Sequence, residues 1–179
     1  MKKTVLLSIV MVVLISQSRP QQFYNVLNYG AKNDSSRIAT KAIAAAIDAA
    51  SKKGGGTIYF PAGKYLTGPI HLRSNITILI DAGAELHFSD NFDDYLPMVE
   101  SRYEGVDIKS FSPLFYAFKA ENISITGRGV INGHGKKWWD YVLNFKDDQP
   151  RNKWQKIFDM ENKNIIMPDD SAQTRRGFL

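Results

Sequence analysis

The amino-acid sequence predicts an all-β fold, a right-handed parallel β-helix, with an amphipathic capping helix near its N-terminus. Two observations lead to this prediction. Short apolar strands separated by turn residues follow one another from residue 57 onward, and similar segments recur along the chain. One amphipathic helical segment directly precedes the first of these strands. Strand repeats with a period slightly above 20 residues are typical of solenoids, in which each rung buries its apolar face against the next one.

The repeat is visible in two pairs of segments. Residues Phe60–Leu66 match Ile80–Leu86 at an offset of 20, and Asn75–Ile78 recurs as Asn122–Ile125, 47 residues later. An asparagine tolerates the unusual backbone angles of a rung corner, and stacked side-chain amides can hydrogen-bond along a solenoid. We therefore expect the two asparagines at equivalent corners. We prefer this structural role to the alternative that both are N-glycosylation sites, although each begins an N-x-[ST] sequon.

The segment before the first strand is predicted to be a capping helix. Apolar residues recur with helical spacing from Ile38 to Lys53, and the glycines Gly54–Gly56 end the segment. The polar turn Asn33–Ser36 can supply the N-terminal cap of this helix. Because the end of a solenoid exposes backbone groups and an apolar cross-section, a terminal element must cover it. We expect the helix to do so.

The first residues are predicted to be a targeting segment. Two lysines precede an apolar run from Thr4 to Ile15, and the small residues Ser16 and Ser18 suit a cleavage site. The run is shorter than the roughly 20 residues that a membrane-spanning helix needs. We predict a signal peptide over residues 1–18 and a mature domain over 19–179. The protein is then secreted or periplasmic, with no stable membrane association after cleavage.

Composition excludes several classes of protein. The 179 residues include 44% hydrophobic and 23% charged residues, the formal net charge is +5, and cysteine is absent. A disordered chain, a disulfide scaffold and a thiol nucleophile are therefore excluded. No segment gathers Lys and Arg as a nucleic-acid-binding face would, so no nucleic-acid partner is predicted. The mild basic excess is compatible with an acidic polysaccharide.

Two irregular stretches interrupt the strands. They run from Ser89 to Ala117 and from Lys136 to about Asp170, and both are polar and aromatic. Long loops on a solenoid often form its binding face. Within them, aromatic rings can stack on sugars and basic side chains can attract sugar carboxylates. The candidate substrate-binding residues on this basis are Arg102, Tyr103, Lys136, Trp138 and Trp139. Of the two tryptophans, we expect one to be packed and one exposed.

The sequence offers no convincing catalytic group. Adjacent carboxylates occur at Asp93-Asp94, Asp147-Asp148 and Asp169-Asp170, always in loop-like segments, so we expect solvated acids. His134 stands between two glycines of a turn, and His71 and His87 are isolated within strands. No histidine and carboxylate have the spacing of a metal site. We therefore predict no catalytic residue in this chain, no metal site and no cofactor.

Several segments resemble the N-terminal part of family 28 glycoside hydrolases, the polygalacturonases and related pectin hydrolases. The resembling segments are Tyr29–Lys32, Gly54–Tyr65, Ile125–Gly133, Asp90–Tyr95, Glu100–Gly105 and Gly135–Asp140. The last three are similar to the bacterial, exo-acting branch. The resemblance extends over the whole mature chain and implies a pectate-lyase-like β-helix. It also implies inverting hydrolysis of α-1,4-galacturonosyl bonds, with pectin or polygalacturonate as the acidic plant polysaccharide.

The family's catalytic motifs are not found in this chain. The resemblance implies three catalytic aspartates in an Asn-Thr-Asp and a Gly-Asp-Asp motif, followed by Gly-His-Gly and Arg-Ile-Lys. The sequence has no Asn-Thr-Asp and no Arg-Ile-Lys. Its Gly-His-Gly at 133–135 precedes the position where the family's motif would fall, so we take it as a coincidence. We therefore expect a truncated β-helix that lacks the catalytic rungs and is inactive by itself. Two alternatives remain open: a non-catalytic polysaccharide-binding solenoid, and a polysaccharide lyase or tailspike-like β-helix.

Overall fold

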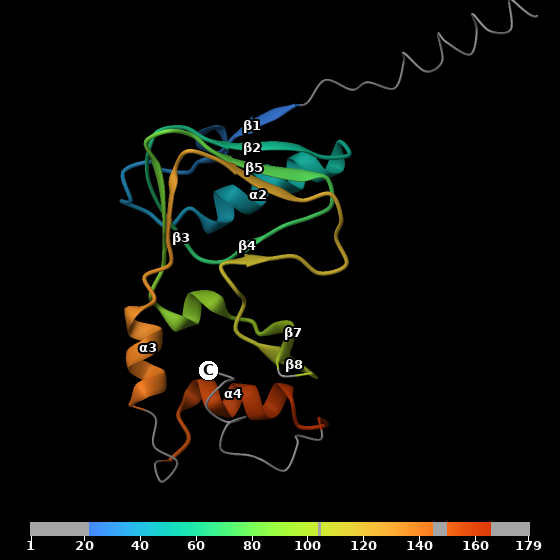
Figure 1. Ribbon diagram of the computed structural model, residues 1–179, viewed down its shortest axis with the longest axis vertical. Coiled ribbons are helices and arrows are strands. Elements are labelled where there is room, and N and C mark those ends of the chain that lie inside the picture. Colours follow the sequence, from blue (N-terminus) through green and yellow to red (C-terminus); the bar gives the residue numbers. More distant parts are fainter. Residues whose placement is uncertain (1–21, 104, 145–149, 166–179) are drawn as a thin grey trace, which may run out of the picture.

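The computed structural model describes residues 22–103, 105–144 and 150–165, and most of its strands pair in parallel (Figure 1). The strands are β1 (Phe23–Asn25), β2 (Gly56–Phe60), β3 (Gly63–Thr67), β4 (Ile70–His71), β5 (Ile76–Ile80), β6 (Ala84–Phe88), β7 (Val99–Tyr103), β8 (Val106–Ser110), β9 (Phe115–Tyr116), β10 (Ser124–Gly127) and β11 (Val130–Asn132). The helices are α2 (Thr40–Lys52), α3 (Lys136–Leu143) and α4 (Lys153–Glu161), with the 3-10 turns η1 (Val26–Tyr29) and η2 (Phe92–Tyr95).

The strands form three parallel sheets that wind as a solenoid. One sheet has the order β1-β2-β5-β10, the second β11-β6-β3, and the third pairs β4 with β9. The chain passes through β2, β3 and β4 in the first rung, then through β5, β6 and β9, and then through β10 and β11. The predicted parallel β-helix is therefore confirmed.

The core lies between the sheets and follows the alternation of each strand. In β5, Ile76, Ile78 and Ile80 are buried while the residues between them are half-buried. Ile58 of β2 pairs with Ile78 of β5, so the same kind of side chain stacks on itself from rung to rung. Each fully buried isoleucine contributes about 1.5–3 kcal/mol through removal of apolar surface from water.

The predicted register is right in one sheet and wrong in the next. Phe60 pairs with Ile80, as the offset of 20 requires. After the following turn the offset is 21, because Tyr65, and not Leu66, pairs with Leu86. The turn before β6 is one residue longer than the turn before β3. The extra residue lets Tyr65 and Leu86, both fully buried, face the core together.

The two asparagines lie at equivalent corners, as predicted. Asn75 (φ 63°) and Asn122 (φ 54°) both adopt left-handed backbone angles. They precede β5 and β10, which pair directly. At the other end of β10, Gly127 (φ 121°) lies so close to the Ile80 backbone that a Cβ has no room. Backbone geometry at these corners therefore selects asparagine or glycine.

Helix α2 covers the end of the solenoid, as expected for a cap. Its buried residues Ile43, Ala46, Ile47 and Ala50 belong to the main core. Two details of the prediction are wrong. The helix begins at Thr40, two residues later than predicted, so Ile38 lies outside it and is partly exposed. The N-cap is Ala39, without a side-chain cap, whereas the 33–36 turn bonds to β3 through Ser35 N and Lys64 O.

The two irregular stretches are more ordered than predicted. The first contains η2 and an antiparallel hairpin of β7 and β8, and its last residues belong to β9. The second contains α3 and α4. Together, η2, the β7–β8 hairpin, α3 and α4 form an outer module at the end of the molecule opposite β1 and β2 (Figure 1). The fold is therefore a β-helix with a mixed side module.

The predicted signal segment lies outside the described residues. Within the described ranges, no helix is both long enough and apolar enough to cross a membrane.

Candidate functional site

The residues predicted on α3 are divided between packing and exposure. The Trp138 ring lies 4.2 Å from the Phe92 ring and 5.1 Å from that of Tyr95. Trp139 points outward and is 66% exposed. The expectation of one packed and one exposed tryptophan is therefore confirmed. Lys136 is exposed, and its ammonium contacts Asp140 at 2.7 Å, one helical turn away.

The residues predicted in the first irregular stretch lie near the tip of the β7–β8 hairpin. The Arg102 guanidinium contacts Asp107 at 3.3 Å and donates to the Gly105 carbonyl at 3.1 Å. Tyr103 is half-buried against a small apolar cluster that contains Ile108 and Phe158. This hairpin and α3 stand on opposite sides of the outer module (Figure 1). The five predicted residues therefore belong to two separate surfaces.

The outer module is held together by aromatic rings. Buried Phe92 contacts Trp138, Tyr141 and Trp154, with ring centroids 4.2, 5.5 and 5.0 Å away. Aromatic pairs at these separations add about 0.5–1.5 kcal/mol each beyond their buried area. Phe92 therefore joins η2 to both α3 and α4. No periodic pattern in the sequence predicted this cluster, because its rings come from three short elements.

The acids of the first predicted pair are not simply solvated. The Asp93 carboxylate accepts hydrogen bonds from Lys153 Nζ at 2.6 Å and from Trp154 Nε1 at 2.8 Å. These bonds, together with the positive charge of Lys153, lower the pKa of Asp93. Asp94 accepts a hydrogen bond from the Ser89 hydroxyl. Both acids thus stabilise the module. The pairs 147–148 and 169–170 lie outside the described residues.

His87, which was expected to be isolated within a strand, contacts the turn residue His134. His87 Nδ1 lies 3.0 Å from His134 Nε2, and His87 Nε2 lies 2.9 Å from Glu85 Oε2. The hydrogen bond to His87 lowers the pKa of Glu85. A sequence signal existed, since His87 and His134 are 47 residues apart, like the two corner asparagines. Within the described ranges, no cluster of three or more His, Asp or Glu side chains could hold a metal ion.

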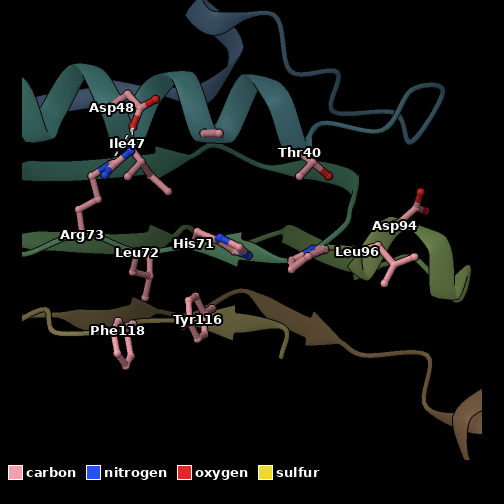
Figure 2. A pocket seen from close by; sticks show the side chains of 12 residues that line it. Thr40, Ile47, Asp48, His71, Leu72, Arg73, Asp94, Leu96, Tyr116 and Phe118 are labelled. Carbon is pink, nitrogen blue, oxygen red and sulfur yellow. Dashed lines mark hydrogen bonds and ion pairs between the residues drawn. The ribbon is translucent and has the colours of Figure 1, made fainter. Parts of the chain in front are cut away.

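A cleft of about 490 Å³ opens beside the capping helix (Figure 2). Its walls come from α2, from β4 and the residues just after it, from the end of η2, and from β9 with Phe118. In β4 and β9, Ile70 pairs with Phe115 and faces the core, so His71 and Tyr116 face outward into the cleft. The sequence did not predict this site, because its walls are far apart along the chain.

The polar groups of the cleft are ordered by contacts at its edges. Arg73 bonds to the Asp48 carboxylate through Nη2 at 2.7 Å and through Nε at 2.8 Å. His71 Nε2 lies 3.0 Å from the hydroxyl of buried Ser112. Partial burial lowers the pKa of His71, which keeps its imidazole neutral near pH 7.

The strand order and the corner asparagines define the class of this protein: a right-handed, pectate-lyase-like parallel β-helix. A family model described as "Rhamnogalacturonase A/epimerase, pectate lyase-like" matches residues 23–177. The chain therefore belongs to this family.

Known relatives include hydrolases of polygalacturonate. An exo-poly-alpha-D-galacturonosidase of Dickeya chrysanthemi is 36% identical over 132 residues, which are 69% of this chain and 21% of that protein. The crystal structure of an exopolygalacturonase from Thermotoga maritima superposes with a TM-score of 0.67 at 34% identity, over 82% of this chain and 33% of that one. The resemblance to family 28 polygalacturonases is thereby confirmed. The chain spans about a fifth to a third of the length of these relatives.

A relative with a different activity matches a shorter segment. Alginate lyase 7 of Azotobacter vinelandii is 45% identical over 64 residues, which are 31% of this chain and 8% of that protein. A stretch of this chain is therefore similar to part of a lyase as well as to hydrolases.

Proposed function

We propose that this chain is the opening part of a polygalacturonase-type glycoside hydrolase, which hydrolyses α-1,4-galacturonosyl bonds of pectin with inversion. One observation carries the proposal. The match to the Thermotoga maritima exopolygalacturonase extends over 82% of the chain, more than the cap and the rungs contain. It therefore includes at least part of the outer module. Such a module distinguishes one branch of a β-helix family better than the rungs do, because loops carry function while rungs carry the fold.

In this proposal the catalytic carboxylates come from other rungs. Inverting hydrolysis needs two carboxyl groups roughly 6.5–9.5 Å apart, with space for the sugar and a water molecule between them. We do not assign Asp93 and Asp94 to this role, because their carboxylates already accept hydrogen bonds from Lys153, Trp154 and Ser89. We therefore expect the 179 residues alone to be inactive.

The last rung supports a continuation of the solenoid. Ile125 and Ile131 pair with Ile78 and Leu86, which are fully buried. Yet Ile125 is 43% exposed and Ile131 is 44% exposed. These two side chains occupy core positions and lack the next layer in the described part of the chain. Another rung stacked on β10 and β11 would bury them and pair the open strand edges.

The exposed face of α3, on one side of the outer module, is the proposed contact surface for the polysaccharide. Trp139 is the exposed aromatic platform of α3. The side chain of Lys136 beside it is 86% exposed, so its weak surface pair with Asp140 leaves the ammonium open to sugar carboxylates. Trp138 supports this surface from below by its contacts with Phe92. Arg102 and Tyr103 belong to a second, separate contact on the hairpin. Affinity electrophoresis in gels with polygalacturonate tests these roles: Trp139→Ala should reduce retardation, whereas the exposed Met160→Ala should not.

The reaction itself is tested by the products. The catalytically complete protein should release saturated galacturonate from polygalacturonate, with inverted anomeric configuration in the first product seen by proton NMR. A lyase would instead create unsaturated ends that absorb in the ultraviolet. Unsaturated products would overturn the hydrolase proposal and favour the lyase alternative. Binding with neither product would favour a non-catalytic solenoid.

The proposed location is outside the cytoplasm, because the first residues resemble a signal peptide and the proposed substrate is an external polymer. Mass spectrometry of the protein recovered from periplasm or medium tests this. We expect an N-terminus near residue 19.

A further inference from the structure

The cleft beside α2 combines the two kinds of surface that sugar sites use. Tyr116 and Phe118 give aromatic area, and Phe118 is a large side chain that remains 52% exposed. Polar groups converge from other elements, namely Asp48 on α2 and His71 and Arg73 near β4 (Figure 2). A volume of about 490 Å³ is within the range of roughly 300–1,000 Å³ of small-molecule sites.

The polar groups of the cleft offer both donors and acceptors to hydroxyl groups. The Asp48–Arg73 pair presents a carboxylate next to a guanidinium, and the two partners hold each other in place. His71 uses Nε2 for Ser112, so its Nδ1 is available toward the cleft. Burial and the charge of Glu100 raise the pKa of Tyr116, so its hydroxyl stays protonated and can donate. Neighbouring donors and acceptors suit vicinal hydroxyls, each of which donates and accepts.

The charge of the cleft disfavours an acidic sugar. Among the lining residues, Asp48 and Asp94 carry negative charge, and only Arg73 carries positive charge. Two charges outside the lining, Lys119 over the Phe118 ring and Glu100 near Tyr116, are opposite in sign. Because Asp48 already neutralises Arg73, Asp94 leaves a net negative charge. A uronate carboxylate would therefore meet no lining cation that is free of a carboxylate partner.

We propose that this cleft is an accessory binding site for an uncharged sugar residue, distinct from the surface that contacts the polyuronide. The sugar ring lies against Tyr116 and Phe118, and its hydroxyls bond to the Asp48–Arg73 pair and to His71. The proposal does not depend on the hydrolase function, since a non-catalytic solenoid would offer the same cleft. It gives the protein a means of holding a heteropolysaccharide by its neutral residues while acidic residues contact the outer module.

Saturation-transfer NMR on the whole chain tests the proposal, because it reads the ligand and tolerates a protein that self-associates. The neutral probes are methyl α-D-galactopyranoside and methyl α-L-arabinofuranoside. The acidic counterpart of the first is the methyl glycoside of α-D-galacturonic acid, with its carboxylate free. We expect saturation transfer to at least one neutral sugar, with a dissociation constant on the order of 1 mM, and at least fivefold weaker binding of the uronate. No transfer to either neutral sugar, or stronger transfer to the uronate, would overturn the proposal.

Variants locate the site. Phe118→Ala and His71→Ala should each weaken neutral-sugar binding at least fivefold. Met160→Ala removes an apolar side chain of similar exposure, 62% against 52% for Phe118, from α4 and should leave binding unchanged. Asp94→Asn should reduce the discrimination against the uronate. Circular dichroism checks that each variant is folded. Equal binding by the parent chain, Phe118→Ala and His71→Ala would place the sugar elsewhere and contradict the proposal.

Discussion

Asn122 donates a side-chain hydrogen bond to the carboxamide oxygen of Asn75 at 2.9 Å, across 47 residues of chain. Both residues also have positive φ, so each one shapes its corner through its backbone angles as well as through its side chain. The backbone turns the corner, and the amide connects that corner to the corner of the next rung. The pair therefore fixes the stacking of β10 on β5.

Replacement of Asn75 separates these two contributions. Asn75→Ala should lower the free energy of unfolding by about 2–3 kcal/mol, because alanine disfavours the left-handed region and the amide bond is lost. Asn75→Gly keeps the backbone freedom and loses only the amide, so a loss of about 1 kcal/mol is expected. Urea titrations of the three proteins measure the difference. Equal stability of the alanine and glycine variants would show that the corner geometry is not strained.

Buried Tyr65 predicts destabilisation at alkaline pH. Burial raises the pKa of its phenol from 10.0 to about 12. The pKa of this phenol is higher in the folded protein than in the unfolded chain. The folded state therefore gains its full stabilisation at pH values below the unfolded pKa, and this contribution is lost as the pH rises from about 10 to 12. Tyr65→Phe should therefore show a smaller loss of stability over that interval. It should also be about 1–2 kcal/mol less stable at neutral pH, since the Tyr65 hydroxyl donates to the Pro61 carbonyl at 2.8 Å.

Tyr95 provides an internal comparison for that experiment. Its pKa is also raised to about 12 by burial, and its hydroxyl donates to the Ser89 carbonyl at 2.7 Å. Tyr95→Phe should reduce the alkaline loss in the same way. Melting curves between pH 9 and 12 measure both effects. An unchanged pH dependence in both variants would contradict burial as the cause.

Because Asp93 of η2 bonds to Lys153 and Trp154 of α4, we expect the contact between η2 and α4 to weaken in acid. The pKa of Asp93 is lowered below 3.8 by Lys153 and Trp154, so its contribution is present above that value and is lost as the pH falls through the lowered pKa. Asp93→Asn should increase hydrogen exchange of the α4 amides at pH 6, and the difference should shrink under acid conditions. Asp140→Asn breaks the exposed pair with Lys136 and serves as the control. Equal exchange in α4 for both variants would contradict the role of Asp93.

The exposed edge of the last rung predicts self-association of the 179-residue chain. Ile125 and Ile131 stand at core positions without a covering layer in the described structure, next to unpaired strand edges. Ile125→Lys with Ile131→Lys places charge on this edge and should shift the chain toward monomer. Sedimentation velocity compares the parent and the variant over a tenfold concentration range. A parent chain that stays monomeric throughout would contradict the prediction.

The regular part of the fold could be predicted because each rung repeats a local pattern. Alternation in Ile76–Ile80 and the recurrence of Asn75 at Asn122 directly encode strands, corners and stacking. The repeat did not encode turn length, so the register after Phe60 was wrong by one residue. A single extra residue in a turn changes every later pairing without changing the hydrophobic pattern.

The outer module and the cleft could not be predicted for a different reason. Phe92 packs on rings of α3 and α4, which lie 46 or more residues away in the sequence and share no repeat with it. The Asp48–Arg73 pair likewise depends on how the cap meets the first rung, just after β4. Candidate residues such as Trp139 were found from their chemistry, whereas the surfaces to which they belong required the structure.

A chimera tests the central claim most directly. Residues 22–165 replace the matching segment of the Thermotoga maritima exopolygalacturonase, and galacturonate release from polygalacturonate is measured for this chimera and for the 179-residue chain alone. The account predicts release by a folded chimera and none by the chain alone, because this segment supplies the cap, the first rungs and the outer module while other rungs supply the catalytic acids. Release by the chain alone, or a cooperatively melting chimera without activity, would contradict it.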